Sequence, residues 1–300
     1  MNNKSKFSLL LVITLMTIGL LSSCFKEDLS DCPLPFQVTI KALDIDLNDI
    51  TESGEIKSVI LFVFDENQNL IDHFELTADQ VKSRKPINIV MDYPGHESLT
   101  FIAWGNSDSN FNCSQVSSVK TINDLYVRLT KKDGHAQPAS DFFQGKLEMT
   151  VEYGGVGQGQ SRVVEIHRMT SGVTITAIDL KQWNNNQQGE YHYVLRSSKD
   201  TYDPHGNLVG EIVSYKPGAT FTENENFYAP IFYTFPSEHY VVDIYCNEEL
   251  IFTAEKDASG NHFVPEIGKT LNIIIDFRAT ISIQVAITPW NVVYQYVDFK

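Results

Sequence analysis

Hydrophobic and polar residues alternate along most of the chain after residue 35. The alternating runs are short, rich in Val, Ile and Phe, and bounded by Asn, Asp, Gly and Pro; they include FQVTIKALDIDL, KSVILFVFDE, NLIDHFEL, PINIVMDY and LTFIAWGN. A period of two in such residues is typical of β-strands. Many short strands at this spacing predict an all-β fold of antiparallel β-sandwiches and not alternating βαβ units.

Turn residues and two helical patterns punctuate these strands. The polar run Asp65–Asn69 predicts that Val59–Leu76 is a hairpin, and KDASGN at Lys256–Asn261 predicts a second hairpin between LIFTAEK and KTLNIIIDF. Helical patterning is confined to Thr77–Ser83 and Ser117–Leu129. Helices are therefore expected to contribute little to the core.

The length of the chain indicates two domains. Its 300 residues exceed the roughly 100 to 200 residues of one domain. Glu152–Ser161 contains four glycines and no apolar period, which predicts a domain junction or a long hairpin loop. We expect an N-terminal sandwich at 36–155 and a C-terminal sandwich at 156–300.

The N-terminus has the pattern of a lipoprotein leader. Lys4 and Lys6 precede the apolar run Leu9–Leu21, which is shorter than the roughly 20 residues that span a membrane. The tetrapeptide LSSC that follows resembles a bacterial lipobox. It predicts cleavage between Ser23 and Cys24, which makes 1–23 the signal peptide, and lipidation of Cys24.

The residues after the lipobox indicate where the lipid would place the chain. Lys26, Glu27 and Asp28 resemble the surface-export signal of Bacteroidota lipoproteins, although a solvated charged tether has the same composition. We interpret 24–35 as a lipidated tether. No later apolar run reaches 18 residues, so attachment to the outer membrane is expected through the acyl chains.

Charge and cysteine content limit which partners and which disulfide bonds the protein can have. The net charge of −15, or −17 without the two leader lysines, argues against nucleic acid partners. Besides Cys24, three cysteines remain and none forms a CxxC pair. We expect a bridge between Cys32 and Cys113, and a buried free thiol at Cys246 within an alternating strand.

Motifs for catalysis or cofactor binding are absent. The sequence contains no HExxH, GxSxG, phosphate-binding loop or dinucleotide fingerprint. We therefore predict no enzyme activity and no cofactor. A hydrolase whose triad assembles only in space stays open as an alternative.

One acidic stretch matches most of a calcium-binding loop. Positions 1, 3, 5 and 12 of that motif are Asp44, Asp46, Asn48 and Glu55, with Glu52 at position 9. Position 6, where glycine makes the sharp turn, is Asp49, and the flanks read as strands. We favour an exposed loop at a strand end, with Ile45 and Leu47 pointing inward. A second match beginning at Asp65 fails at Leu76, which favours a hairpin turn.

Aromatic residues offer surfaces that could stack on sugar rings. They are Trp104, Trp183, Trp290, Tyr294 and Tyr296. Near the C-terminus, alternation places Val293, Val297 and Phe299 on one face and the two tyrosines on the other. Because aromatic residues are favoured in strands and cores, we interpret them as core packing beside a half-exposed edge.

The order of these features resembles a known family. The lipobox with CFKEDLSDCP, the strand pair VILFVFDENQNLI, then TFIAWGN and VEIHRMTSGVTITA, are similar to the FimB-type fimbrial anchor lipoproteins of Bacteroidota. The resemblance implies two tandem transthyretin-like β-sandwich domains, an outer-membrane location at the base of a fimbrium, a shaft subunit as partner, and a role in limiting fimbrial length.

The position of the first arginine in the chain distinguishes an anchor from a shaft subunit of the same fold. Related shaft subunits lose their lipidated segment by cleavage after an arginine, whereas the first arginine here is Arg84, inside the predicted first sheet. The lipid is therefore expected to stay attached, unless the protease accepts lysine. A shaft or tip subunit remains an alternative.

The last strands are the expected contact with the partner. An edge strand pairs through its free N–H and C=O groups. We predict that Ile281 to Phe299 meets the shaft subunit; the interface residues are Ile281, Ile283, Val285, Val293, Val297 and Phe299. A surface glycan-binding or adhesive lipoprotein would share the anchor and the sandwiches, and is the main alternative.

Overall fold

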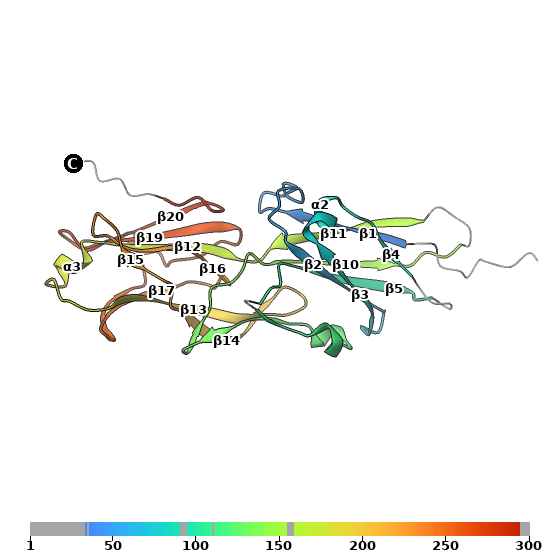
Figure 1. Ribbon diagram of the computed structural model, residues 1–300, viewed down its shortest axis with the longest axis horizontal. Helices are drawn as coiled ribbons and strands as arrows, with labels where there is room; N and C mark the ends of the chain where they lie inside the picture. Colours follow the sequence, from blue (N-terminus) through green and yellow to red (C-terminus); the bar gives the residue numbers. More distant parts are fainter. Residues whose placement is uncertain (1–33, 35, 91–94, 110, 155–158, 295–300) are drawn as a thin grey trace, which may run out of the picture.

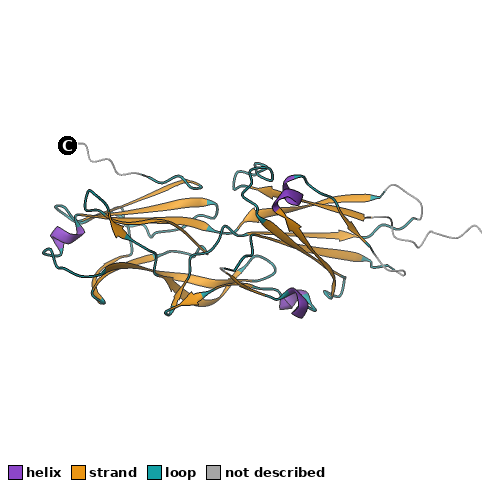
Figure 2. Ribbon diagram, viewed as in Figure 1, coloured by secondary structure: helices purple, strands orange, loops and turns teal. Residues whose placement is uncertain are grey.

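The computed structural model describes residue 34 and residues 36–90, 95–109, 111–154 and 159–294. These residues form an elongated molecule in which nearly all of the regular secondary structure is β-strand (Figures 1 and 2). The strands are β1 (Phe36–Leu43), β2 (Ser58–Phe64), β3 (Leu70–Thr77), β4 (Ile87–Ile89), β5 (Ser98–Gly105), β6 (Phe111–Cys113), β7 (Val127–Leu129), β8 (Lys131–Lys132), β9 (His135–Ala136), β10 (Phe143–Thr150), β11 (Gln160–Arg168), β12 (Ser171–Ile178), β13 (Tyr191–Tyr202), β14 (Leu208–Tyr215), β15 (Thr220–Phe221), β16 (Phe227–Thr234), β17 (Val241–Cys246), β18 (Glu249–Ala254), β19 (Lys269–Asp276) and β20 (Ser282–Pro289). The helices are α2 (Ala78–Lys82), α3 (Leu180–Trp183) and the 3-10 turns η1 (Val116–Ser118) and η2 (Ile122–Asp124).

The strands form three sheets, which confirms the predicted all-β fold. One has the order β3-β2-β5-β10-β11-β1-β4, another β15-β16-β12-β19-β20, and the third β18-β17-β13-β14-β9-β8 with β7 and β6 attached through β13. Most pairs are antiparallel, but β1 with β11, β12 with β19, and β9 with β14 are parallel. Each of the three sheets formed by the described strands is thus mixed and contains one parallel pair.

The seven-stranded sheet curls around its own core. Apolar residues of β1, β2, β4, β5 and β11 belong to one buried cluster. Phe36 of β1 stacks on Phe101 of β5 with ring centroids 5.7 Å apart, although two strands separate β1 from β5 in the sheet. Helix α2 closes this core with Val81, which is 1% exposed.

The other two sheets face each other across a second core. It combines residues of β12, β16 and β19 with residues of β13 and β17. The same cluster reaches the outer face of the first sheet through Phe62, Phe64 and Trp104, which it shares with Ile122 and Leu125. The halves of the molecule are therefore joined by continuous apolar packing and not by a free linker.

One of the two predicted helices forms. Thr77 caps α2: its hydroxyl accepts from the Gln80 N–H, and the Gln80 side chain accepts from the Thr77 N–H. The prediction of a helix at Ser117–Leu129 is wrong, because that stretch contains only part of η1, then η2 and β7. Its apolar residues Val119, Ile122, Leu125 and Val127 are buried against both halves, which an irregular path allows and a single helical stripe does not.

In the polar turns, an aspartate side chain accepts hydrogen bonds from two backbone N–H groups of the same turn. The hairpin of β2 and β3 forms as predicted, and Asp65 accepts from the N–H groups of Asn67 and Asn69. Asp257 does the same for Ser259 and Asn261, so KDASGN is a turn. It does not join a hairpin of neighbouring strands, however, since β18 pairs with β17 and β19 pairs with β12 and β20. The two strands lie in different sheets because each buries an opposite side of the core.

The glycine-rich stretch joins two neighbouring strands. β10 and β11 pair antiparallel on either side of it, which agrees with the hairpin-loop interpretation. The division between 36–155 and 156–300 stays a prediction about domains. Pairing within the sheets runs across it, because β11 lies in the seven-stranded sheet and β6 to β9 join the sheet of β13 and β14.

Candidate functional site

The C-terminal strand β20 lies at the edge of the five-stranded sheet. All eight of its residues pair with β19, from Ser282 opposite Asp276 to Pro289 opposite Lys269. Ile283 and Val285 pack against the core without being fully buried, whereas Ile281 and Ile287 are 40% and 42% exposed. The strand thus offers backbone and apolar side chains at one surface.

The chain turns back directly after β20. The Val292 N–H donates to the Pro289 carbonyl over 3.0 Å, and Asn291 adopts a left-handed conformation with φ of 60°. The Tyr294 N–H then donates to Oδ1 of Asn272, a β19 side chain that is 1% exposed. We call Pro289–Tyr294 the C-terminal turn; it is held against the sheet at both ends.

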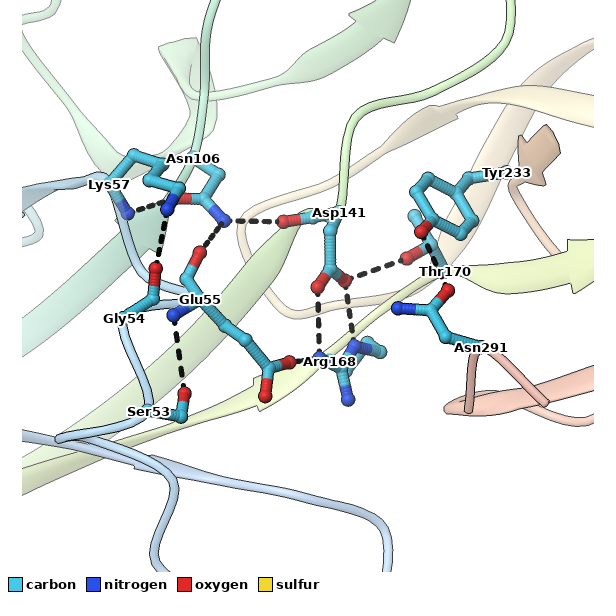
Figure 3. A network of polar contacts seen from close by, with 10 residues as sticks. All are labelled: Ser53, Gly54, Glu55, Lys57, Asn106, Asp141, Arg168, Thr170, Tyr233 and Asn291. Carbon is cyan, nitrogen blue, oxygen red and sulfur yellow. Dashed lines mark hydrogen bonds and ion pairs between the residues drawn. The ribbon is translucent and has the colours of Figure 1, made fainter. Parts of the chain in front are cut away.

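Trp290 fixes this turn at the middle of the molecule. Its ring stacks on Tyr233 of β16 with centroids 4.7 Å apart and planes 17° from parallel. The guanidinium carbon of Arg168 lies 4.2 Å from the Trp290 ring centroid, which is a cation–π distance. The Tyr233 hydroxyl donates to Oδ1 of Asn291 over 2.7 Å (Figure 3). Side chains of β16 and β11, together with Asn272 of β19, therefore hold the C-terminal turn.

Arg168 is the centre of this arrangement. It ends β11, and its side chain is 3% exposed. Nε and Nη2 donate to the two carboxylate oxygens of Asp141 over 2.7 and 2.9 Å, and Nη2 also contacts Glu55 (Figure 3). A buried guanidinium needs such a bidentate partner, because its desolvation would otherwise be costly.

Further bonds tie the loops around the ion pair. The Asn106 amide donates to the backbone oxygens of Glu55 and Asp141 over 3.0 and 2.8 Å, and its own oxygen accepts from the Lys57 N–H over 2.7 Å (Figure 3). Asn106 has φ of 59°, a conformation that asparagine tolerates better than most residues. We call Glu55, Asn106, Asp141 and Arg168 the Arg168 network; it joins loops of the first sheet to the chain entering β12.

Electrostatics within the network favour the charged arginine. Burial alone would lower the pKa of Arg168, but its hydrogen bonds and charge contacts with Asp141 and Glu55 raise it above the usual value. Burial raises the pKa of Asp141 and outweighs the opposing effect of Arg168. The site is therefore a structural ion pair surrounded by aromatic rings.

Many of the predicted site residues lie outside the described residues. These are Ser23, Cys24, Lys26, Glu27, Asp28, Cys32, Tyr296, Val297 and Phe299. The lipidation site, the export signal and the Cys32–Cys113 bridge accordingly stay predictions. Among the predicted interface residues, Ile281, Ile283 and Val285 lie along β20 and its start, and Val293 is partly buried in the C-terminal turn.

The two described cysteines, Cys113 and Cys246, are not bridged to each other. Cys113 ends the short strand β6 instead of lying in a loop, and burial raises the pKa of its thiol to about 12. Cys246 in β17 is 0% exposed, as expected for a small apolar residue in a core strand.

In the loop that resembles a calcium-binding motif, the first carboxylate accepts hydrogen bonds from the backbone of the loop itself. Asp44 accepts from the N–H groups of Asp46 and Asn48, and Glu55 faces Arg168 instead of the loop. Within the described residues, no group of three or more His, Cys, Asp and Glu side chains is arranged to hold a metal ion. The expectation that Ile45 and Leu47 point inward is wrong: they are 48% and 68% exposed, since β1 ends at Leu43 and the chain turns.

The tryptophans serve packing. Trp104 is 1% exposed in the second core, and Trp183 of α3 packs on Phe252 and Phe277. Tyr294 is the more accessible ring, at 51% exposed. Among the described tryptophans, Trp290 alone contacts the Arg168 network.

Sequence reasoning found β20 but missed the network that supports its end. Asp141 and Glu55 lie 27 and 113 residues before Arg168 in the chain. Only a lone arginine at the end of an apolar strand pattern hinted at a buried pair.

No helix in the described part of the chain is both long and apolar enough to cross a membrane.

Comparison with known proteins agrees with this architecture. The family described as "Fimbrillin-A associated anchor proteins Mfa1 and Mfa2" matches residues 29–296. The major fimbrium anchoring subunit FimB of Porphyromonas gingivalis strain W83 is 36% identical over 308 aligned positions, covering all of both chains, and FimB of strain ATCC 33277 is also 36% identical with full coverage. Both relatives are described as anchoring subunits of a fimbrium.

Solved structures show the same fold at low sequence identity. The fimbrial anchor protein Mfa2 of Porphyromonas gingivalis aligns with a TM-score of 0.62 at 16% identity, over 86% of this chain and 98% of that one. A protein of Bacteroides thetaiotaomicron aligns with a TM-score of 0.66 at 14% identity, over 86% and 96%. The family match over residues 29–296 and the full-length relatives at 36% identity establish that this chain belongs to the fimbrillin-A associated anchor proteins.

Proposed function

We propose that this chain is the lipid-anchored base subunit of a fimbrium. In this proposal, Cys24 carries acyl chains that hold the protein on the outer face of the outer membrane. The C-terminal region joins the first shaft subunit by β-strand pairing. The proposal rests on membership of an anchor family together with the lipobox LSSC.

The placement of the first and last strands supports this division of labour. β1 lies in the right-hand half of the molecule in Figure 1 and β20 in the left-hand half. An anchor needs one end for the membrane and another for its partner. The edge position of β20 is the observation that carries the strand-pairing part of the proposal, because a strand with one unpaired side can add a strand from another subunit.

Retention of the N-terminal segment fits the same role. Arg84, the first arginine, follows α2 and is paired with Asp49 over 2.7 Å. An arginine-specific cut there would separate β1, β2 and β3 from the remaining strands of their sheet. A subunit that stays lipidated and offers one joining surface can start a fimbrium once, and we propose that its abundance thereby limits fimbrial length.

Replacing the lipobox cysteine tests the anchor. In cells that carry Cys24→Ala as their only copy, we expect fimbriae in the culture medium instead of on the cell surface, as judged by electron microscopy and immunoblotting of both fractions. Cys32→Ala, a cysteine in the same tether but outside the lipobox, is the control and should leave fimbriae attached. Surface fimbriae at normal levels in Cys24→Ala cells would exclude lipid anchoring through this residue.

A further inference from the structure

β20 differs from the other strands that end the sheets. The outermost strands β4, β15 and β8 have two or three residues, β3 carries Asp72 and Glu75, and the six-residue β18 begins with Glu249. β20 has eight residues, SIQVAITP, and no charge, although the chain as a whole has a net charge of −15. Natural sheets usually protect long edges with charges or shortness. The unprotected edge of β20 therefore needs an explanation.

Two hydrogen bonds reveal which backbone groups of β20 face outward. The Asn272 side chain on β19 donates to the Ala286 carbonyl over 3.1 Å, so Ala286 faces β19. The Ala258 N–H, outside the sheet, donates to the Ile283 carbonyl over 2.8 Å. Because backbone direction alternates along a strand, Ile283, Val285 and Ile287 point their N–H and C=O groups away from β19.

Contacts at both ends limit the open part of this edge. At one end the turn that contains Ala258 occupies the Ile283 carbonyl. At the other, Pro289 has no N–H and its carbonyl accepts from Val292. Among the described residues, no hydrogen bond reaches the outward groups of Val285 and Ile287. The open edge therefore consists of these two residues and the Ile283 N–H.

We infer that β20 is an acceptor edge on which an extended segment of the adjoining fimbrial subunit pairs, in a register fixed by Val285 and Ile287. This inference rests on the proposed anchor function and makes the strand pairing specific. The Asp257–Asn261 turn and Pro289 stop the pairing at each end. About four residues of the incoming segment, roughly 13 Å, fit between them.

The surroundings define the chemistry of that segment. Ile287 is 42% exposed beside the partly buried Val285, so an apolar side chain of the partner covers them on the core side. On the other face the strand presents the uncharged Gln284 and Thr288. Five unpaired backbone groups require a peptide backbone, and the acidic chain repels an acidic segment. The occupant is thus a strand with alternating apolar residues and no acidic side chains along the paired part.

Proline at an outward position tests the edge without breaking the sheet. Ile287→Pro removes only an N–H that points away from β19, whereas Ile287→Thr alters the side chain but keeps that N–H. In tagged full-length protein purified from native outer membranes, we expect Ile287→Pro to reduce co-purified shaft subunit about tenfold or more, and Ile287→Thr to retain most of it. Thermal melting of the purified variants checks that both remain folded.

A second variant tests the stop at Ala258. This residue follows Asp257 in a turn whose Gly260 N–H donates back to the Asp257 carbonyl, a position that accepts proline. Ala258→Pro frees the Ile283 carbonyl, so shaft recovery should stay equal or rise.

The outcomes separate this inference from the anchor function. Undiminished shaft recovery with folded Ile287→Pro overturns the acceptor edge while the Cys24→Ala experiment can still support anchoring. Light scattering tests whether the occupant is a second copy of this chain. If the wild-type protein self-associates and the Ile287→Pro variant does not, the inference is also overturned. Failure of the wild-type chain to recover any shaft subunit contradicts the proposed function itself.

Discussion

The first and last strands of the described chain have opposite environments. β1 is paired on both sides, with β11 along its whole length and with β4 over three residues, and Phe36, Val38, Ile40 and Ala42 are at most 2% exposed. β20 is paired on one side, and none of its residues is fully buried. Both strands are eight residues long and alternate apolar with polar residues over most of their length. Position in the sheet, more than composition, separates a strand that completes a core from one that remains available to a partner.

This difference suggests how one fold serves two attachments. Removing β1 would expose the core of the first sheet, so the segment that follows the predicted lipid is an integral part of the fold. β20 can change its outer neighbour without exposing that core. The C-terminal turn and the Arg168 network hold the end of β20 in place. Four predictions, from the largest effect to the smallest, test this contrast.

Matched aspartate substitutions should separate the two strands most clearly. Ile40→Asp in β1 buries an unpaired carboxylate at a site 2% exposed, and we expect it to abolish folding at a cost of several kcal/mol. Ile287→Asp in β20, at a site 42% exposed, should cost about 1 kcal/mol or less. Circular dichroism melting curves and soluble yield measure both. Equal losses would remove the distinction between the strands.

Loss of the buried arginine should weaken the support of β20. Arg168→Met leaves Asp141 without its charged partner, and we expect the free energy of unfolding to fall by about 3 to 5 kcal/mol. The surface pair provides a control: Arg84→Met should cost about 1 kcal/mol or less, since the Arg84 side chain is 39% exposed. Urea titration compares the two. A small effect at Arg168 would show that the network contributes little.

Removing the Trp290 ring should release the C-terminal turn locally. Trp290→Ala loses the stacking on Tyr233 and the contact with Arg168, worth about 1 to 2 kcal/mol together. Hydrogen exchange should speed up in the C-terminal turn and leave β1 unchanged, while Trp290→Phe restores most of the protection. Faster exchange throughout β1 as well would mean that the turn is not an independent unit.

The smallest expected effect is a loss of stability in acid. The hydrogen bond from Thr51, together with Arg84, lowers the pKa of Asp49 from 3.8 to about 2. Since the folded state holds the depressed pKa, its stabilising effect is present above pH 3.8 and is lost as the pH falls toward 2. Asp49→Asn should flatten the fall in melting temperature over that interval, whereas Asp133→Asn in the exposed turn between β8 and β9 should not. Identical acid profiles for wild type and Asp49→Asn would contradict this assignment.

Local sequence patterns predicted the strands and turns that depend on neighbouring residues. The β2–β3 hairpin follows from alternation on both sides of DENQN, where Asp65 binds its own turn. The Thr77 cap of α2 is equally local. The predictions failed where contacts between distant residues determine the conformation. Residues 117–129 do not form one helix, because their apolar side chains are buried between the two halves of the molecule. Ile45 and Leu47 are exposed because the chain turns after β1.

The sequence by itself determined the all-β fold, the turn positions and the apolar, uncharged character of β20, because alternation and turn chemistry act over a few residues. Tertiary structure alone decided that β1 is enclosed, that β20 has one open side bounded by Ala258 and Pro289, and that Arg168 meets Asp141, Glu55 and Trp290. These features depend on sheet order and on contacts between residues far apart in the chain. A pattern with a period of two specifies which face of a strand is buried, but it does not specify the strand's neighbours.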